Sequence, residues 1–153
     1  MQKKYAFTII EVMIIVTIIG IIAAIVLPSF TGHITVAKEV SVKDNLRMMR
    51  SAIELYAAQH NCVAPGYPLD NQAASPLHAT FVTQMVNSSQ YLSRMPENPF
   101  NNKSTLKMVG NNEDFPAAPV ETDSFGWIYK PATKTIKLNW PGNDSTGLPY
   151  FNY

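Results

Sequence analysis

The strongest pattern along the chain is an apolar run from Phe7 to Leu27, preceded by a six-residue basic leader and interrupted by one acid, Glu11. Pro28 ends the run. At about 1.5 Å per residue, a helix of this length would extend roughly 32 Å, enough to cross the hydrocarbon core of a bilayer. A carboxylate inside such a helix costs about 2.5–3.5 kcal/mol, so it usually marks a function. Residues 7–28 are therefore predicted to form a transmembrane helix in which Glu11 has a role.

Beyond Pro28 the apolar positions change to an amphipathic helical period. From about residue 31 to residue 60, apolar or aromatic side chains recur at spacings of three and four, and charged residues occupy the other face. The predicted buried stripe consists of Val42, Leu46, Met49, Ile53, Tyr56 and His60. We expect this segment to continue the first helix, with a bend or a loosened turn at Gly20 and Pro28, and to pack on a small head.

The chain after this helix predicts a second, shorter helix and then strands. The shorter helix is expected over residues 76–87, with Leu77, Phe81 and Met85 as its apolar face. Residues 91–102, which contain two prolines and three asparagines, predict a stiff, ordered loop. Aromatic and β-branched residues predict strands at about 105–109, 125–129 and 135–140, the last two forming a hairpin.

These elements define an α+β fold in one outer domain, residues 29–153. A long N-terminal helix would pack on a small antiparallel sheet, with residues 110–124 as an exposed loop. About 120 residues is an ordinary size for one domain.

The distribution of charge predicts the orientation of the chain in a membrane. Lys3 and Lys4 precede the apolar run, and the next basic residue is Lys38. This asymmetry places the N-terminus in the cytoplasm and the outer domain on the far side. The formal net charge is +1 with 12 basic and 11 acidic residues, and it falls to −1 (10 against 11) if residues 1–6 are removed. A nearly neutral chain has no electrostatic footprint for nucleic acid.

The side chains that could carry catalysis are few and scattered. His33, His60 and His78 are far apart in the sequence, no serine or cysteine lies in a recognisable nucleophile motif, and Cys62 is the single cysteine. A single cysteine excludes an intramolecular disulfide. His60 and Cys62 are interpreted as a histidine at a helix end with a buried cysteine nearby, because no second pair of ligands follows at a zinc-like spacing. The chain is therefore not expected to be an enzyme.

The N-terminal segment resembles the class III signal of type IV pilins and type II secretion pseudopilins. In that family a prepilin peptidase removes the leader and the new N-terminal residue is N-methylated. The resemblance implies cleavage between Ala6 and Phe7 and N-methylation of Phe7. Glu11 then becomes the fifth mature residue, and Gly20 and Pro28 become the fourteenth and twenty-second. Ala6 departs from the glycine that the family usually has.

The same resemblance implies a mechanism of assembly. The carboxylate of Glu11 would pair with the α-amine of Phe7 on a neighbouring subunit, because an opposite charge offsets the cost of a carboxylate among apolar helices. The alternative is that Glu11 reaches the lipid headgroups from near the helix end. The missing disulfide and the Pro-x-x-Pro loop at Pro96 and Pro99 favour the pseudopilin branch, since many type IV pilins close a C-terminal loop with a disulfide.

Major pseudopilins often bind one calcium ion in a C-terminal loop, and the resemblance extends this expectation to Asp144, Asn143 and Ser145. Asp123 lies before the predicted hairpin. Calcium takes six to eight oxygen ligands, commonly several carboxylates. The alternative is a plain turn in which Asp144 and Asn143 bond their own backbone, and the residue types favour it. No cofactor is therefore required, and calcium stays open.

The function that the resemblance implies is that of a structural subunit of a type II secretion pseudopilus or a related filament. The subunit would wait in the inner membrane with its head in the periplasm and then join a periplasmic or extracellular filament. Its partners would be copies of itself, minor pseudopilins, the prepilin peptidase, and the assembly platform with its ATPase. The alternatives are a type IV pilin for adhesion, motility or DNA uptake, and a membrane-anchored enzyme or binding domain.

Overall fold

The computed structural model describes residues 8–87 and 90–153, with the side chains of 26–32 left undescribed. The chain divides into two compact units, Met1–Ala37 and Lys38–Tyr153. Its elements, in order, are α1 (Ile9–Gln59), η1 (Pro68–Asp70), α2 (His78–Val82), η2 (Thr83–Asn87), β1 (Leu106–Met108), β2 (Trp127–Lys130), η3 (Pro131–Thr133), β3 (Thr135–Leu138) and η4 (Tyr150–Asn152).

The first unit contributes the N-terminal part of α1. The predicted continuity is confirmed, because α1 continues through both Gly20 and Pro28. Its large apolar side chains between Ile9 and Ile25 are exposed around the whole helix.

Among the residues that the structure describes, no helix combines the length and the continuous apolar character that a membrane span requires.

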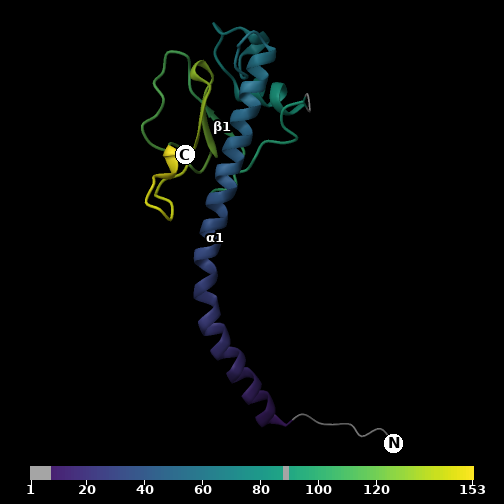
Figure 1. Cartoon of the computed structure of the whole chain (residues 1–153), viewed down its shortest axis with the longest axis vertical. Coiled ribbons are helices and arrows are strands. Elements are labelled where there is room, and N and C mark those ends of the chain that lie inside the picture. Colours follow the sequence, from purple (N-terminus) through teal and green to yellow (C-terminus); the bar gives the residue numbers. More distant parts are fainter. Residues whose placement is uncertain (1–7, 88–89) are drawn as a thin grey trace, which may run out of the picture. The chain divides into compact units, whose positions relative to one another are not determined.

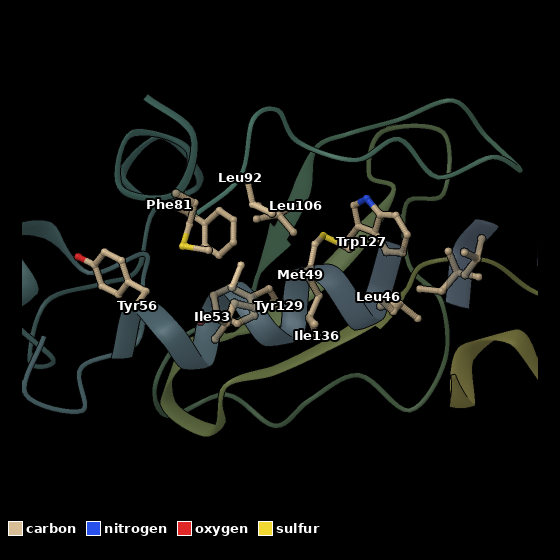
Figure 2. Close-up of a cluster of buried hydrophobic side chains, with 14 of the residues drawn as sticks. Leu46, Met49, Ile53, Tyr56, Phe81, Leu92, Leu106, Trp127, Tyr129 and Ile136 are labelled. Carbon is tan, nitrogen blue, oxygen red and sulfur yellow. The ribbon is translucent and has the colours of Figure 1, made fainter. Parts of the chain in front are cut away.

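The second unit is built around the outer part of α1, which lies beside the sheet (Figure 1). The stripe is confirmed from Val42 to Tyr56, where every predicted position is at most 2% exposed, whereas His60 is only partly buried. Figure 2 shows four of these side chains packed with Phe81, Leu92 and Trp127 in one core: Leu46, Met49, Ile53 and Tyr56. Val42 belongs to the same cluster. The spacing of three and four residues places the stripe on one helix face, and burial of that face holds the outer half of α1 against the head.

The predicted second helix is present but irregular. α2 continues directly into η2, a π-helical turn, and the two together span His78–Asn87. Phe81 and Met85 are fully buried, as expected. Leu77 was predicted on the same apolar face, and this is wrong: it lies before α2 and is 50% exposed.

The sheet has three strands in the order β1-β2-β3, and its predicted antiparallel character is only half right. β2 and β3 form the expected antiparallel hairpin, with Trp127 opposite Leu138. β1 pairs parallel to β2, with Leu106 opposite Trp127, so the sheet is mixed. The parallel pair arises because the long segment 109–126 returns the chain to the starting edge before β2 begins.

Residues 110–124, predicted as an exposed loop, partly cover the second face of the sheet. Alternate residues of β2 point to opposite faces, so Trp127 and Tyr129 join the main core while Ile128 joins a smaller cluster. That cluster also contains Val109 and Phe151, with Phe115 and Val120 from the loop packed against it. The loop is irregular because its apolar contacts and prolines, rather than a ladder of backbone bonds, fix its path.

The ordered loop predicted over residues 91–102 is confirmed. Trp127 donates its indole N–H to the Pro96 carbonyl at 2.9 Å. Asn98 is fully buried and donates to the Gly126 carbonyl at 3.2 Å, while its side-chain oxygen accepts the Phe100 amide at 2.9 Å.

Candidate functional site

The N-terminus of α1 is closed by a capping box formed by Thr8 and Glu11. The Glu11 carboxylate accepts the Thr8 backbone N–H and the Thr8 hydroxyl, both at 2.9 Å. The Glu11 backbone N–H in turn donates to the Thr8 hydroxyl oxygen at 3.3 Å. This reciprocal pair satisfies helix donors that otherwise have no partner. Glu11 is therefore folded back toward the N-terminal end of its helix.

Glu11 was predicted from the sequence to have a role, whereas Thr8 was not. The signal was available, since Thr8 followed three residues later by glutamate is the pattern of a capping box. The proposed cleavage point, Ala6 and Phe7, lies outside the described residues. The cleavage, the N-methylation, and the flexibility assigned to Gly20 and Pro28 stay predictions.

A second polar centre lies in the C-terminal loop, residues 142–150. Its backbone closes on itself: the Asp144 N–H donates to the Leu148 carbonyl at 2.8 Å, and the Tyr150 N–H donates to the Gly142 carbonyl at 3.0 Å. Gly142 and Gly147 adopt positive φ values of 89° and 88°, a conformation that glycine takes without steric cost. The two glycines let the chain reverse direction around Asp144.

Asp144 organises this loop through five donors. One carboxylate oxygen accepts the backbone N–H and the hydroxyl of Thr146, at 2.9 and 2.7 Å, and the Leu148 N–H at 2.9 Å. The other oxygen accepts the Tyr153 hydroxyl at 2.7 Å and lies 3.5 Å from the Lys43 ammonium. The Asp144 side chain is only 1% exposed, so nearly all of its hydrogen bonding is internal.

Glu39 fixes the same loop to α1. Its carboxylate accepts the backbone N–H and the hydroxyl of Ser145, at 2.9 and 2.8 Å, and the hydroxyl of Tyr150 at 3.0 Å. Glu39 is only 4% exposed. A carboxylate at that depth is tolerated because each of its oxygens is hydrogen-bonded.

The hydrogen bonds around these two acids shift their pKa values. The Tyr153 hydroxyl, followed by the Thr146 donors, holds the pKa of Asp144 well below its usual range. For Glu39, burial raises the pKa, but the bonds from Ser145 and Tyr150 together lower it further, so the net shift is downward. Burial raises the pKa of Tyr150 to about 12, and its bond to Glu39 adds to the shift. Both carboxylates are therefore charged at neutral pH while the tyrosines remain donors.

The residues predicted for calcium do not present a free ligand set. An ionised carboxylate offers about four lone-pair positions, and Asp144 already has five protein donors. The Ser145 hydroxyl is bonded to Glu39. Across the described residues, no three His, Cys, Asp or Glu side chains come close enough to share a metal ion. The geometry fits the alternative, a turn built on Asp144.

His60 and Cys62 do not form a site either. The His60 ring stacks on Tyr56 with 3.8 Å between ring centroids, and its Nδ1 lies 2.8 Å from the Tyr56 carbonyl oxygen. Cys62 was expected to be buried, and this is wrong, because it is exposed in the turn that follows α1. Cys62 adopts a positive φ of 65° in this turn, and the chain that follows it, residues 64–67, is buried.

Comparison with known proteins relates the chain to prepilin-type proteins and to components of type II secretion systems. The family described as "Prokaryotic N-terminal methylation motif" matches residues 1–27. The type II secretion system core protein G of Escherichia coli is 25% identical over 120 residues, covering 72% of this chain and 77% of the relative. The same protein from Pseudomonas aeruginosa is 29% identical over 118 residues, covering 74% and 80%. That of Klebsiella michiganensis is 24% identical over 147 residues, covering 91% and 94%. No solved structure matches the chain at a significant level.

The long helix and the small mixed sheet form a pilin-like α+β architecture, and residues 1–27 match the N-terminal methylation motif. Over most of its length the chain is similar to the core G proteins of type II secretion systems. The resemblance predicted from residues 1–28 is thereby confirmed.

Proposed function

We propose that this protein is a structural subunit of a type II secretion pseudopilus rather than an enzyme. The observation that carries the proposal is the combination of a methylation motif at residues 1–27 with similarity to core G proteins over most of the chain. The motif alone is shared by several kinds of filament, whereas the similarity of the head favours secretion over adhesion, motility or DNA uptake.

The proposal assigns the N-terminal segment to processing, anchoring and assembly. Cleavage after Ala6 would leave Phe7 as a methylated N-terminus, one residue before the capping box of Thr8 and Glu11. Residues 7–28 would hold the subunit in the inner membrane, with the head in the periplasm. In the filament, Glu11 would pair with the Phe7 amine of a neighbouring subunit.

The capping box gives the Glu11 carboxylate a defined orientation within its own subunit. Thr8 turns the Glu11 carboxylate toward the N-terminal end of the helix, where the new amine would lie. A positively charged amine also interacts unfavourably with the N-terminal end of its own helix dipole, so a carboxylate nearby relieves that repulsion. Thr8 is thus proposed as a positioning residue for Glu11.

The partners of the subunit follow from this role. They are further copies of the chain along the filament, minor pseudopilins, the prepilin peptidase, and the assembly platform with its ATPase. The head needs no catalytic machinery in this function.

The test is filament assembly in cells that express the prepilin peptidase and the assembly platform. Glu11→Ala is expected to abolish sheared filaments while the processed subunit stays in the membrane fraction. Glu97→Ala, which changes an exposed acid in the head, is the matched control and should assemble normally. Wild-type yields of filaments from Glu11→Ala would contradict the proposal.

A further inference from the structure

We propose that the C-terminal loop of this protein is held to α1 by the Lys43 ammonium and a set of hydroxyl donors, and that its stability does not depend on a divalent cation. The proposal goes beyond the filament function and concerns how the head is built. It rests on three observations: the donors on Asp144, the position of Lys43, and the second attachment at Glu39.

The donors on Asp144 leave its carboxylate no free lone pair with which to bind a metal ion. Three donors occupy one oxygen and two occupy the other, all from protein groups. Loop carbonyls that could complete a metal shell are also bonded: the Leu148 oxygen accepts the Asp144 N–H, and the Asp144 oxygen accepts the Gly147 N–H at 3.0 Å. A cation could enter only by breaking several of these bonds.

Lys43 supplies the positive charge that a bound cation would otherwise bring. Its ammonium lies 3.5 Å from the Asp144 carboxylate and 4.5 Å from the centroid of the Tyr153 ring. Tyr153 donates its hydroxyl to the same carboxylate oxygen. Lys43, Asp144 and Tyr153 therefore form a closed triangle of an ion pair, a cation–π contact and a charge-assisted hydrogen bond.

Glu39 provides the second attachment, one helical turn before Lys43. It binds Ser145 and Tyr150, on either side of the glycine turn at Gly147. The loop is thus fixed to α1 at two adjacent positions of one helix face, spaced at i and i+4. Two attachments of opposite charge restrict both the position and the rotation of the loop.

The experiment uses the full chain, purified in detergent, and measures thermal unfolding with either calcium chloride or a calcium chelator present. The melting temperatures are expected to differ by less than about 1 °C, because a ligand stabilises only in proportion to its occupancy. Terbium is the direct probe, since an ion bound beside Tyr150 or Tyr153 would show sensitised luminescence. No saturable luminescence is expected.

Lys43→Met tests whether the Lys43 ammonium stabilises the C-terminal loop. It should lower the melting temperature by about 2–4 °C in either buffer. Lys107→Met is the matched control, because Lys107 also pairs with an acid, Glu121 at 2.7 Å, and lies over an aromatic ring, but the side chain of Glu121 is 55% exposed whereas that of Asp144 is 1% exposed. It should change the melting temperature by about 1 °C or less. If Lys43→Met does not fold, Tyr153→Phe removes one hydroxyl from the same triangle.

Two results would overturn the proposal. One is a saturable rise of several degrees in the wild-type melting temperature with calcium, together with terbium luminescence that Asp144→Asn abolishes. The other is equal melting temperatures for Lys43→Met and Lys107→Met.

Discussion

The Asn139→Ala substitution removes three hydrogen bonds at the point where the 110–124 loop meets the end of β3. The Asn139 side chain donates to the carbonyls of Val120 and Phe125, at 2.7 and 2.9 Å, and accepts the Val120 N–H at 2.9 Å. Asn139 is fully buried, so water cannot replace these bonds without entering the fold. The substitution therefore removes the side-chain hydrogen bonds that hold the 110–124 loop against the second face of the sheet.

The magnitude follows from the three bonds. Each contributes about 1 kcal/mol net to the free energy of unfolding, and a buried partner left unsatisfied costs about 1–3 kcal/mol. A loss of about 3 kcal/mol is expected after partial relaxation of the loop. For a chain of this size, that loss corresponds to a fall in melting temperature of roughly 6–12 °C.

The assay is thermal unfolding followed by near-UV circular dichroism, combined with hydrogen exchange at the Val120 amide. That amide should lose protection in Asn139→Ala, because its acceptor is gone. Asn112→Ala, at an exposed position in the same loop, is the control and should leave both readouts unchanged. A fall of less than about 2 °C, or unchanged protection of Val120, would refute the reasoning.

Three further predictions concern other parts of the chain. Gly126→Ala should prevent stable folding of the head, because a Cβ there would overlap the Lys103 carbonyl oxygen and lie 2.9 Å from its carbon; the yield of detergent-purified protein and its melting temperature measure this. Thr8→Val should lower filament yield and Thr8→Ser should restore it, because only a hydroxyl maintains the capping box with Glu11; sheared filaments are counted by immunoblot. Glu39 should make the head acid-sensitive: its pKa is lowered by folding, so the stability it contributes is complete above its ordinary value of 4.5 and is lost as pH falls through the folded pKa. Melting curves across this range should show a smaller loss for Glu39→Gln.

Each of these has a control and an outcome against it. Gly20→Ala meets nothing within 4 Å and should be tolerated; a stable Gly126→Ala head would contradict the packing argument. Equal filament yields from Thr8→Val and Thr8→Ser would remove the capping box from assembly. Glu97→Gln should keep the wild-type dependence of melting temperature on pH. If Glu39→Gln also kept the wild-type dependence, Glu39 would not be the source of the acid sensitivity.

The helical stripe could be predicted from the sequence because its determinant is local. Side chains spaced by three and four share one face of a helix whatever surrounds it, so Val42, Leu46 and Met49 were assigned to the core correctly. The strands could be placed to within two residues for the same reason. The prolines and asparagines of residues 91–102 likewise indicated an ordered loop, although not that Asn98 would be its buried anchor.

The direction of β1 could not be predicted in this way. Alternation of side chains describes which face a residue occupies, but it is the same for parallel and antiparallel partners. The connection from β1 to β2 runs through an irregular loop, and its path depends on the apolar cluster around Ile128 and Phe151. That cluster forms only when segments far apart in the sequence are already in place.

The attachment of the C-terminal loop to Glu39 and Lys43 of α1 was not predicted, for a related reason. Glu39 and Lys43 looked like ordinary charged positions on an amphipathic helix, and their partners Ser145 and Asp144 lie about a hundred positions further along. Asp144 itself was identified, but by its resemblance to a calcium loop. Its actual donors, including the Tyr153 hydroxyl, follow from how the loop folds back on α1.

The most direct test of the proposed function is the intact mass of the mature chain, isolated from cells with and without the prepilin peptidase. With the peptidase present, we predict a chain that begins at Phe7 and carries one N-methyl group, and without it a chain that begins at Met1. A chain that begins at Met1 in both cells would contradict processing at Ala6, and with it the assignment to a pseudopilus.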